Sequence, residues 1–210
     1  MRKKELALEV IERLKKEYPE TRCTLDHDEA WKLLVSVRLA AQCTDARVNE
    51  IVPVLFSKYP SPEALAEAEP KDIEEIVRPC GLGHSKARDI SLCMRKLVKD
   101  YGGAVPDDMD RLLELPGVGR MSANLILGDV FGKPAIVTDT HWIRLANRIG
   151  QVDGQKDPAK VEKELQKIVP PEEGNDLCHR FVDHGRVICT ARTKPFCDKC
   201  VLNDICRKKL

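Results

Sequence analysis

The sequence has few aromatic residues and no long apolar run, and its charges almost cancel. Phe, Trp and Tyr together make up 4% of the 210 residues. The longest run without a polar residue, 51–56, contains Pro53 and is far shorter than the roughly twenty residues that span a bilayer. Since the formal net charge is only +1, any affinity for nucleic acid must come from a local basic face.

Other features are absent as well. The first twenty residues are heavily charged, which excludes a secretory signal peptide, and we expect a cytoplasmic protein without a membrane segment. In such a chain, nine cysteines indicate a reducing compartment and a metal site rather than disulfides. No fixed-period repeat, low-complexity tract or extended strand alternation occurs, and 210 residues suffice for one domain or two small ones.

Apolar residues recur with helical spacing along most of the chain, which predicts an all-α fold. Helices are expected at 3–17, after a cap at Asp26 or Asp28, from Asp45, after the cap at Ser61, at 85–100, after a cap at Asp107 or Asp108, at 137–149, at 158–169 and up to about Ile188.

The stretch 115–124 joins two of these helical patterns through two closely spaced glycines. With Pro116 before them, the glycines predict a tight hairpin between helices. Such a turn directs backbone N–H groups outward at the positive end of the second helix, where a phosphate binds without base preference. A helix corner with a glycine cap is the alternative. The residues expected to contact a DNA backbone are Gly117, Val118, Gly119 and Arg120.

A second motif lies near the end of the chain, where four cysteines follow the pattern C-x7-C-x2-C-x5-C. Four thiolates so close together can hold a tetrahedral zinc ion or a 4Fe–4S cluster. Four-thiolate zinc sites usually have two C-x2-C pairs, and the single pair here favours the cluster, with zinc or no metal as alternatives. The predicted ligands are Cys189, Cys197, Cys200 and Cys206, with His179 and His184 as weaker candidates.

The cysteine loop is also basic, and its cations either contact DNA phosphates or form a solvated face. These residues are Arg186, Arg192, Lys194, Lys199, Arg207, Lys208 and Lys209.

Together with 39–45, 81–87 and 137–141, these motifs resemble the helix-hairpin-helix DNA glycosylases, most closely the bacterial endonuclease III family. The resemblance implies a helical barrel domain over 22–134 and a discontinuous domain from 1–21 and 135–210 that carries a 4Fe–4S cluster. It also implies a monomeric repair enzyme in the bacterial cytoplasm that acts on the nucleoid. Such an enzyme flips a damaged or mispaired base out of double-stranded DNA and releases it. The family spacing of the cysteines is six, two and five, so the first gap here is one residue longer.

By motif match, the resemblance assigns Asp139 as the carboxylate that stabilises positive charge on the sugar and directs the nucleophile. An N-cap role for Asp139 is compatible with this. Trp142 stands where a smaller residue is expected and could stack on an extruded base or pack in the core. The expected wedge and base-pocket residues are Gln42, Asp45, Leu82, His141 and Trp142. Gln42 and Leu82 are the wedge residues, and each could instead be an ordinary cap or core residue.

Met121 occupies the position where bifunctional family members have a lysine that forms a Schiff base with the sugar. A thioether cannot form an imine, so lyase activity is expected to be absent or very weak. Lys86 and Lys133 do not match that position. The chain could be a monofunctional glycosylase, an altered or engineered form without its nucleophile, or a damage-binding protein without chemistry. A zinc-dependent transcription factor is a further alternative.

Overall fold

The structure, a computed structural model, describes residues 2–208. This part of the chain forms eleven α-helices and three short 3₁₀ helices and contains no strand, so the prediction of an all-α fold is confirmed. Within the same residues, no helix is both long and apolar enough to cross a membrane.

The chain divides into two compact units, Cys23–Phe131 and a second unit made of Met1–Arg22 with Gly132–Leu210. The expected domain was 22–134, with its boundaries within a few residues of these. Each unit is described by itself.

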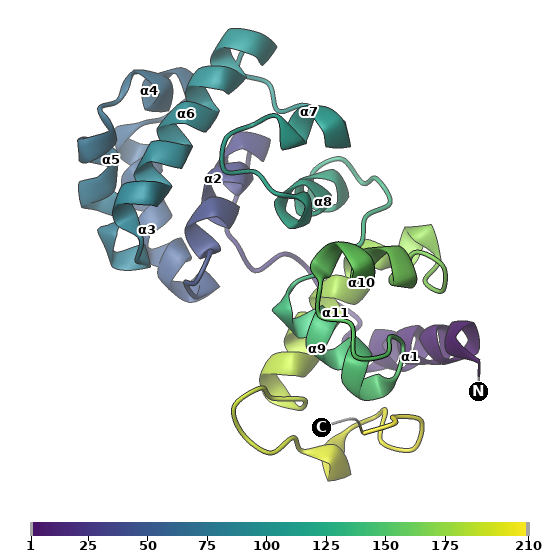
Figure 1. Cartoon of the computed structure of the whole chain (residues 1–210). Coiled ribbons are helices and arrows are strands. Elements are labelled where there is room, and N and C mark those ends of the chain that lie inside the picture. Colours follow the sequence, from purple (N-terminus) through teal and green to yellow (C-terminus); the bar gives the residue numbers. More distant parts are fainter. Residues whose placement is uncertain (1, 209–210) are drawn as a thin grey trace. The chain divides into compact units, whose positions relative to one another are not determined.

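The unit Cys23–Phe131 is built around two helices that pack on most of the others. Helix α6 lies along α4 and α5, and α2 packs on α3, α6 and α8 (Figure 1). Apolar residues at helical spacing, such as Ile90, Met94 and Leu97 of α6, are buried in this core. The helices are α2 (Ala30–Ala40), α3 (Asp45–Lys58), α4 (Pro62–Glu67), α5 (Pro70–Val77), η1 (Arg78–Cys80), α6 (Gly83–Tyr101), α7 (Met109–Leu113) and α8 (Arg120–Asp129).

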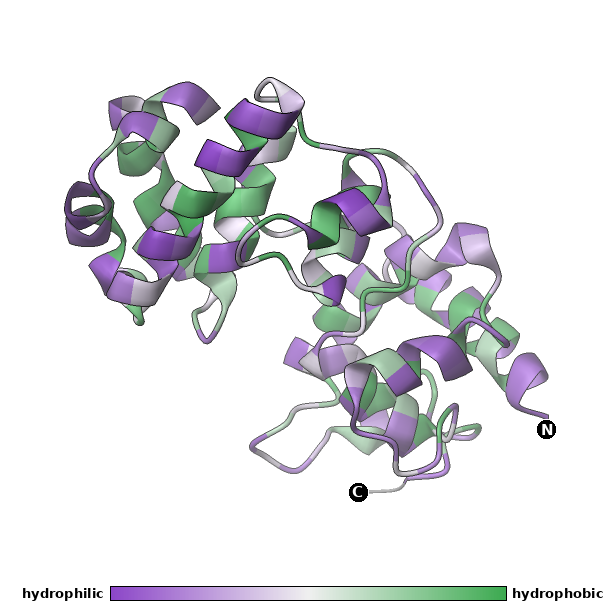
Figure 2. Ribbon diagram, turned by 45° about the horizontal axis from the view of Figure 1, so that its top comes forward, coloured by the Kyte–Doolittle hydropathy of each residue, from purple (hydrophilic) through white to green (hydrophobic). Residues whose placement is uncertain are grey.

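The unit formed from both ends of the chain has its core between α9 and α11, and α1 also packs on α11. Val10, Ile11 and Leu14 form the buried stripe of α1. Figure 2 shows the resulting pattern of apolar and polar faces on the helices of each unit. The helices are α1 (Lys3–Glu17), α9 (Thr140–Ile149), α10 (Pro158–Leu165), η2 (Pro171–Glu173), α11 (Gly174–Val187) and η3 (Cys197–Lys199).

Several helix ends differ from the prediction, whereas α1 spans Lys3–Glu17 as expected. Helix α2 begins after Glu29 rather than after Asp26 or Asp28. Helix α9 begins at Thr140 and not at 137, because Asp139 has extended backbone angles and caps the helix. Helix α10 ends at Leu165, and turns replace the expected helix up to 169.

Candidate functional site

The turn 116–119 between α7 and α8 has a shape that only glycine permits at its centre. Gly117 has a φ of 76°, which L side chains rarely adopt. A Cβ atom on Gly117 would lie 3.0 Å from the Cβ of Asp89 and 3.2 Å from the Cδ of Arg38. Arg38 Nη2 donates to Asp89 Oδ2 at 2.7 Å. The turn is therefore seated directly on a half-buried ion pair, which restricts its shape.

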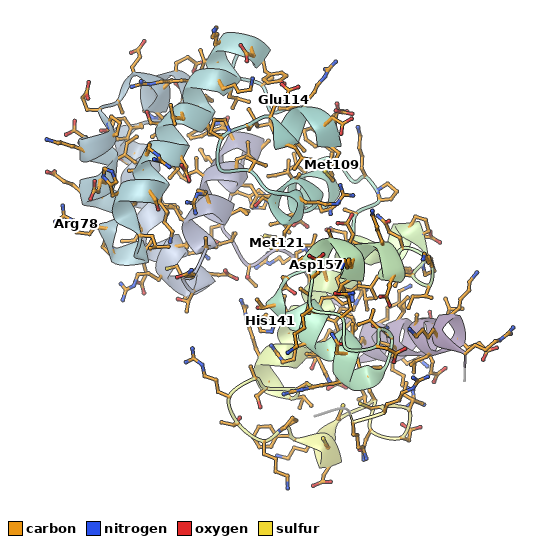
Figure 3. The ribbon with its side chains drawn as sticks, viewed as in Figure 1. Arg78, Met109, Glu114, Met121, His141 and Asp157 are labelled. Atoms are coloured by element: carbon orange, nitrogen blue, oxygen red, sulfur yellow. The ribbon has the colours of Figure 1, made fainter. Side chains whose placement is uncertain are left out.

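The first turn of α8 is left open by the residues that begin it. Gly119 is the N-cap and has no side chain to accept a bond from the helix N–H groups. Arg120 is exposed, and Met121 has an exposed fraction of 39% (Figure 3). The start of this helix can thus present backbone donors and a positive dipole end to an external anion.

Asp139 begins α9 as its N-cap. Its Oδ1 accepts a hydrogen bond from the Trp142 N–H at 2.7 Å, which fixes the orientation of the carboxyl group. Burial raises the pKa of Asp139 to about 6, although the Trp142 N–H and the positive charge of Arg144 favour the carboxylate. With a pKa of about 6, the carboxyl group is mostly charged at neutral pH, and since the side chain is only partly buried, solvent can still reach it.

Trp142 does not form a base platform, which corrects that expectation. Its side chain has an exposed fraction of 0% and packs on Phe181, with ring centroids 5.5 Å apart. Position 142 lies on the inner face of α9, so the indole packs in the core instead of stacking on an extruded base. His141, one residue earlier, is half-buried and contacts Arg144 through Nδ1 at 3.2 Å (Figure 3).

Two of the expected wedge residues have the same unusual backbone conformation. Gln42 has a φ of 56° and Leu82 a φ of 53°, a left-handed region that costs an L-residue about 1–2 kcal/mol. Gln42 is exposed, and Leu82 has an exposed fraction of 52%. Asp45 is different, since it lies in the first turn of α3 and accepts a hydrogen bond from the Thr24 hydroxyl.

The four cysteines of the late loop line one cavity that is partly open to solvent. All four are half-buried and are free thiols. Within residues 2–208, no three His, Cys, Asp or Glu side chains converge on a position for a single metal ion. The thiols thus surround a space instead of meeting at one point.

Hydrogen-bond donors approach these sulfur atoms from several directions. Arg148 Nη1 lies 3.3 Å from Cys189 Sγ, and His184 Nε2 lies 3.3 Å from Cys200 Sγ. The backbone N–H of Leu202 points to Cys200 Sγ, and that of Lys208 points to Cys206 Sγ, both at 3.4 Å. Donors of this kind stabilise thiolate charge, which suits cysteines that act as metal ligands. His184 is therefore placed as a hydrogen-bonding neighbour of Cys200, with its Nδ1 3.1 Å from the Tyr18 hydroxyl.

Residues 35–171 match the family model for the HhH-GPD superfamily base excision DNA repair protein. Endonuclease III of Synechocystis sp. is 42% identical over 205 residues, which cover 97% of this chain and 93% of that protein. The chain belongs to the endonuclease III family.

Other members of the endonuclease III family give the same result. Endonuclease III of Bacillus subtilis is 39% identical and covers 91% of this chain, with 87% of its own length matched. A solved structure of a trapped endonuclease III–DNA covalent intermediate superimposes with a TM-score of 0.94 at 38% identity, covering 99% of this chain and 97% of that one. The expected family and fold are confirmed, and the chain is a DNA repair glycosylase of the endonuclease III type.

The cations predicted in and beside the cysteine loop of this endonuclease III-type chain lie on its surface. Six of the seven expected cations are exposed, namely Arg186, Arg192, Lys194, Lys199, Arg207 and Lys208. Lys209, the seventh, lies outside the described residues. Lys199 also stacks over the exposed ring of Phe196, with its Nζ 5.9 Å from the centroid.

Sequence reasoning missed two arginines of α9 that hold the start of the cysteine loop. Arg144 Nη2 donates to the carbonyl oxygens of Gly185 at 3.0 Å and Cys189 at 3.1 Å. Arg148, one turn later, donates to the carbonyl of Thr190 at 2.7 Å. The i,i+4 spacing of the two cations on the helix that Asp139 caps was the available signal. Only the fold shows that both reach the cysteine loop.

Proposed function

We propose that this chain is a monofunctional glycosylase that releases a damaged or mispaired base from double-stranded DNA and leaves the strand intact. The observation that carries the proposal is Asp139, a partly buried carboxyl with a fixed orientation and a pKa of about 6. Such a group is charged at neutral pH in surroundings where its field is weakly screened.

The chemistry needs one carboxylate and water. The bond between C1′ and the base nitrogen breaks, and its electron pair leaves with the base, which takes up a proton. The Asp139 carboxylate stabilises the positive charge that develops on the sugar. Water then adds to C1′ and loses a proton, which leaves an abasic site.

The hairpin and the two left-handed residues serve the earlier steps. The open first turn of α8 binds a phosphate through its N–H groups. Gln42 and Leu82 enter the space that the everted nucleotide leaves, since both are exposed and held in defined conformations.

We also infer that the cysteine loop holds a 4Fe–4S cluster through Cys189, Cys197, Cys200 and Cys206. The cavity between the thiols and the N–H donors to sulfur both suit a bulky anionic group. When bound, the cluster organises the basic loop that faces phosphates. Purified protein should be brown, absorb near roughly 400 nm and contain iron and inorganic sulfide instead of zinc. A colourless zinc protein would contradict this inference.

A base-release assay tests the reaction. Duplexes with an oxidised pyrimidine, uracil, a thymine mispair or an abasic site are incubated with the protein, and each sample is analysed with and without hot alkali. Enzyme-dependent appearance of alkali-labile sites in at least one duplex that still carries its damaged or mispaired base supports a monofunctional enzyme, and the abasic duplex reports lyase activity alone. Tight binding without release on the whole panel supports the damage-binding alternative, and cleavage without alkali contradicts the proposal.

Met121→Lys tests the assignment of position 121. A lysine in the first turn of α8 should have a lowered pKa beside the positive helix end, and strand nicking and borohydride trapping should appear. Leu113→Lys is the matched control, because Leu113 is also 39% exposed and lies just before the hairpin. Met121→Arg adds the charge without a nucleophilic amine. Trapping only in Met121→Lys supports the assignment, and its absence there contradicts it.

A further inference from the structure

Lys86 is a lysine without contact to solvent in the unit Cys23–Phe131. Its side chain has an exposed fraction of 0%, and burial lowers its pKa. Within the described part of the chain, its hydrogen-bond partners are two backbone carbonyls, those of Leu39 and Cys80, each 2.8 Å from Nζ. A buried ammonium group without a carboxylate is costly, and an arrangement that retains it needs a reason.

The two carbonyls belong to the ends of two different helices. Leu39 lies in the last turn of α2, and Cys80 is the last residue of η1. Carbonyl groups at helix ends lack partners within the helix, and the negative end of the dipole attracts a cation. Lys86 Nζ therefore satisfies both helix ends at once and ties them together.

Each of these helix ends leads directly into one of the left-handed residues. Gln42 follows Leu39 by three residues, and Leu82 follows Cys80 by two. The backbone N–H of Lys86 also donates to the Leu82 carbonyl at 3.0 Å. Burial and the neighbouring Cys43 thiol raise the pKa of Cys80, and the charge of Lys86 lowers it, so the two loops meet beside the ammonium group.

We propose that Lys86 is a positioning residue that clamps the two loops so that Gln42 and Leu82 enter the DNA together. The inference rests on the proposed wedge role of these two residues. Left-handed Gln and Leu are strained, and a strained conformation persists only where the surroundings fix it. The two hydrogen bonds from Lys86 Nζ fix the backbone before each of these residues, and they keep the two loops at a constant separation.

The test uses the full-length protein and a duplex with 2-aminopurine opposite a tetrahydrofuran abasic analogue. Unstacking of the 2-aminopurine by the wedge raises its fluorescence. Lys86→Met keeps the apolar bulk but removes the donors, so the population of the inserted state should fall about tenfold or more. Affinity for undamaged duplex, which depends on the hairpin, should stay within about twofold.

Lys96→Met is the matched control, because Lys96 lies on the same helix and pairs with Asp100 on the surface. It should leave the fluorescence unchanged. If Lys86→Met does not fold, Lys86→Gln serves, since its shorter amide can reach one carbonyl but not both and should give an intermediate signal. A wild-type fluorescence rise in the folded variant, even with a lower melting temperature, would show a merely structural role and overturn the clamp.

Leu82→Ala and Gln42→Ala separate the two proposals. If both lower the fluorescence rise and Lys86→Met does not, the clamp is wrong and the wedge role stands. If neither lowers it, the wedge role is wrong and the clamp falls with it.

Discussion

Helices α8 and α9 are both ten residues long, yet they begin in opposite ways. Helix α9 starts with the carboxylate of Asp139, which accepts the N–H of Trp142. Helix α8 starts after Gly119, which offers no side-chain acceptor. One helix end is thus satisfied by the chain's own negative charge, and the other is available for a negative charge from outside. The same physical feature can therefore hold a reacting carboxylate in one place and bind a phosphate in another.

The largest expected effect comes from removing the charge at the start of α9. Asp139→Asn keeps a cap oxygen but loses the carboxylate, so base release should fall by at least about a hundredfold. Single-turnover assays on a damaged duplex measure this. Asp157→Asn is the control, because Asp157 caps α10 in the same way, accepting the Lys160 N–H at 2.9 Å (Figure 3). Equal losses in both variants would contradict the role of Asp139.

The same variant should be more stable than the wild type at alkaline pH. Folding raises the pKa of Asp139 from 3.8 to about 6, so its contribution to stability is greatest below pH 3.8 and is lost as pH rises through 6. Asp139→Asn should gain at most about 3 kcal/mol in the free energy of unfolding at pH 8 and roughly half of that at pH 5. Urea titrations at both pH values measure the gain. A gain that grows toward acid pH would mean that the pKa is lowered instead.

Giving α8 the same kind of start as α9 should weaken DNA binding. Gly119 has a φ of −98°, and a Cβ added there meets nothing within 4 Å, so Gly119→Asp fits the backbone. The new carboxylate would occupy the helix N–H groups and repel phosphate, and affinity for duplex DNA should fall about tenfold or more with little change in melting temperature. Gly119→Asn caps without charge and should show a smaller loss. Unchanged affinity in Gly119→Asp would place the phosphate contact elsewhere.

The smallest effect is expected when the wild-type protein is assayed at acid pH without any substitution. With a pKa of about 6, Asp139 loses its charge as pH falls, and the rate of base release at pH 5 should be about tenfold below its plateau. Rates measured from pH 5 to 8, with circular dichroism as a check on folding, give the profile. A flat profile down to pH 5 would show that the carboxylate does not titrate in this range or is not needed.

Local patterns predicted the helices and the motifs, because they depend on neighbours in sequence. Apolar spacing predicted α1, and the paired glycines predicted the turn before α8. The extended conformation of residues 137–139 was not predicted. The apolar spacing of the following helix continues back to Val137, whereas the helix itself begins only after its N-cap, Asp139.

Long-range contacts explain the remaining differences. The position of Trp142 close to Asp139 suggested a base pocket, but Trp142 packs on Phe181, which lies in a helix far along the chain. Lys86 precedes buried Ile90 by one helical turn, which marks the inner face of α6, yet a lysine there reads as polar surface in any periodic pattern. The partners that make its burial tolerable lie in other elements and cannot be read from α6.

The segment between Cys189 and Cys197 is one residue longer than the family spacing, and it forms a closed loop. The Phe196 N–H donates to the Ile188 carbonyl at 3.0 Å, which closes the segment at its base, and Thr190 bonds to Thr193 within it. Length can therefore be added or removed at the tip of this closed loop while both sulfur positions stay where they are. A pattern search that demands a fixed count between the first two cysteines would overlook chains like this one, whereas a search that lets only that interval vary would retain them.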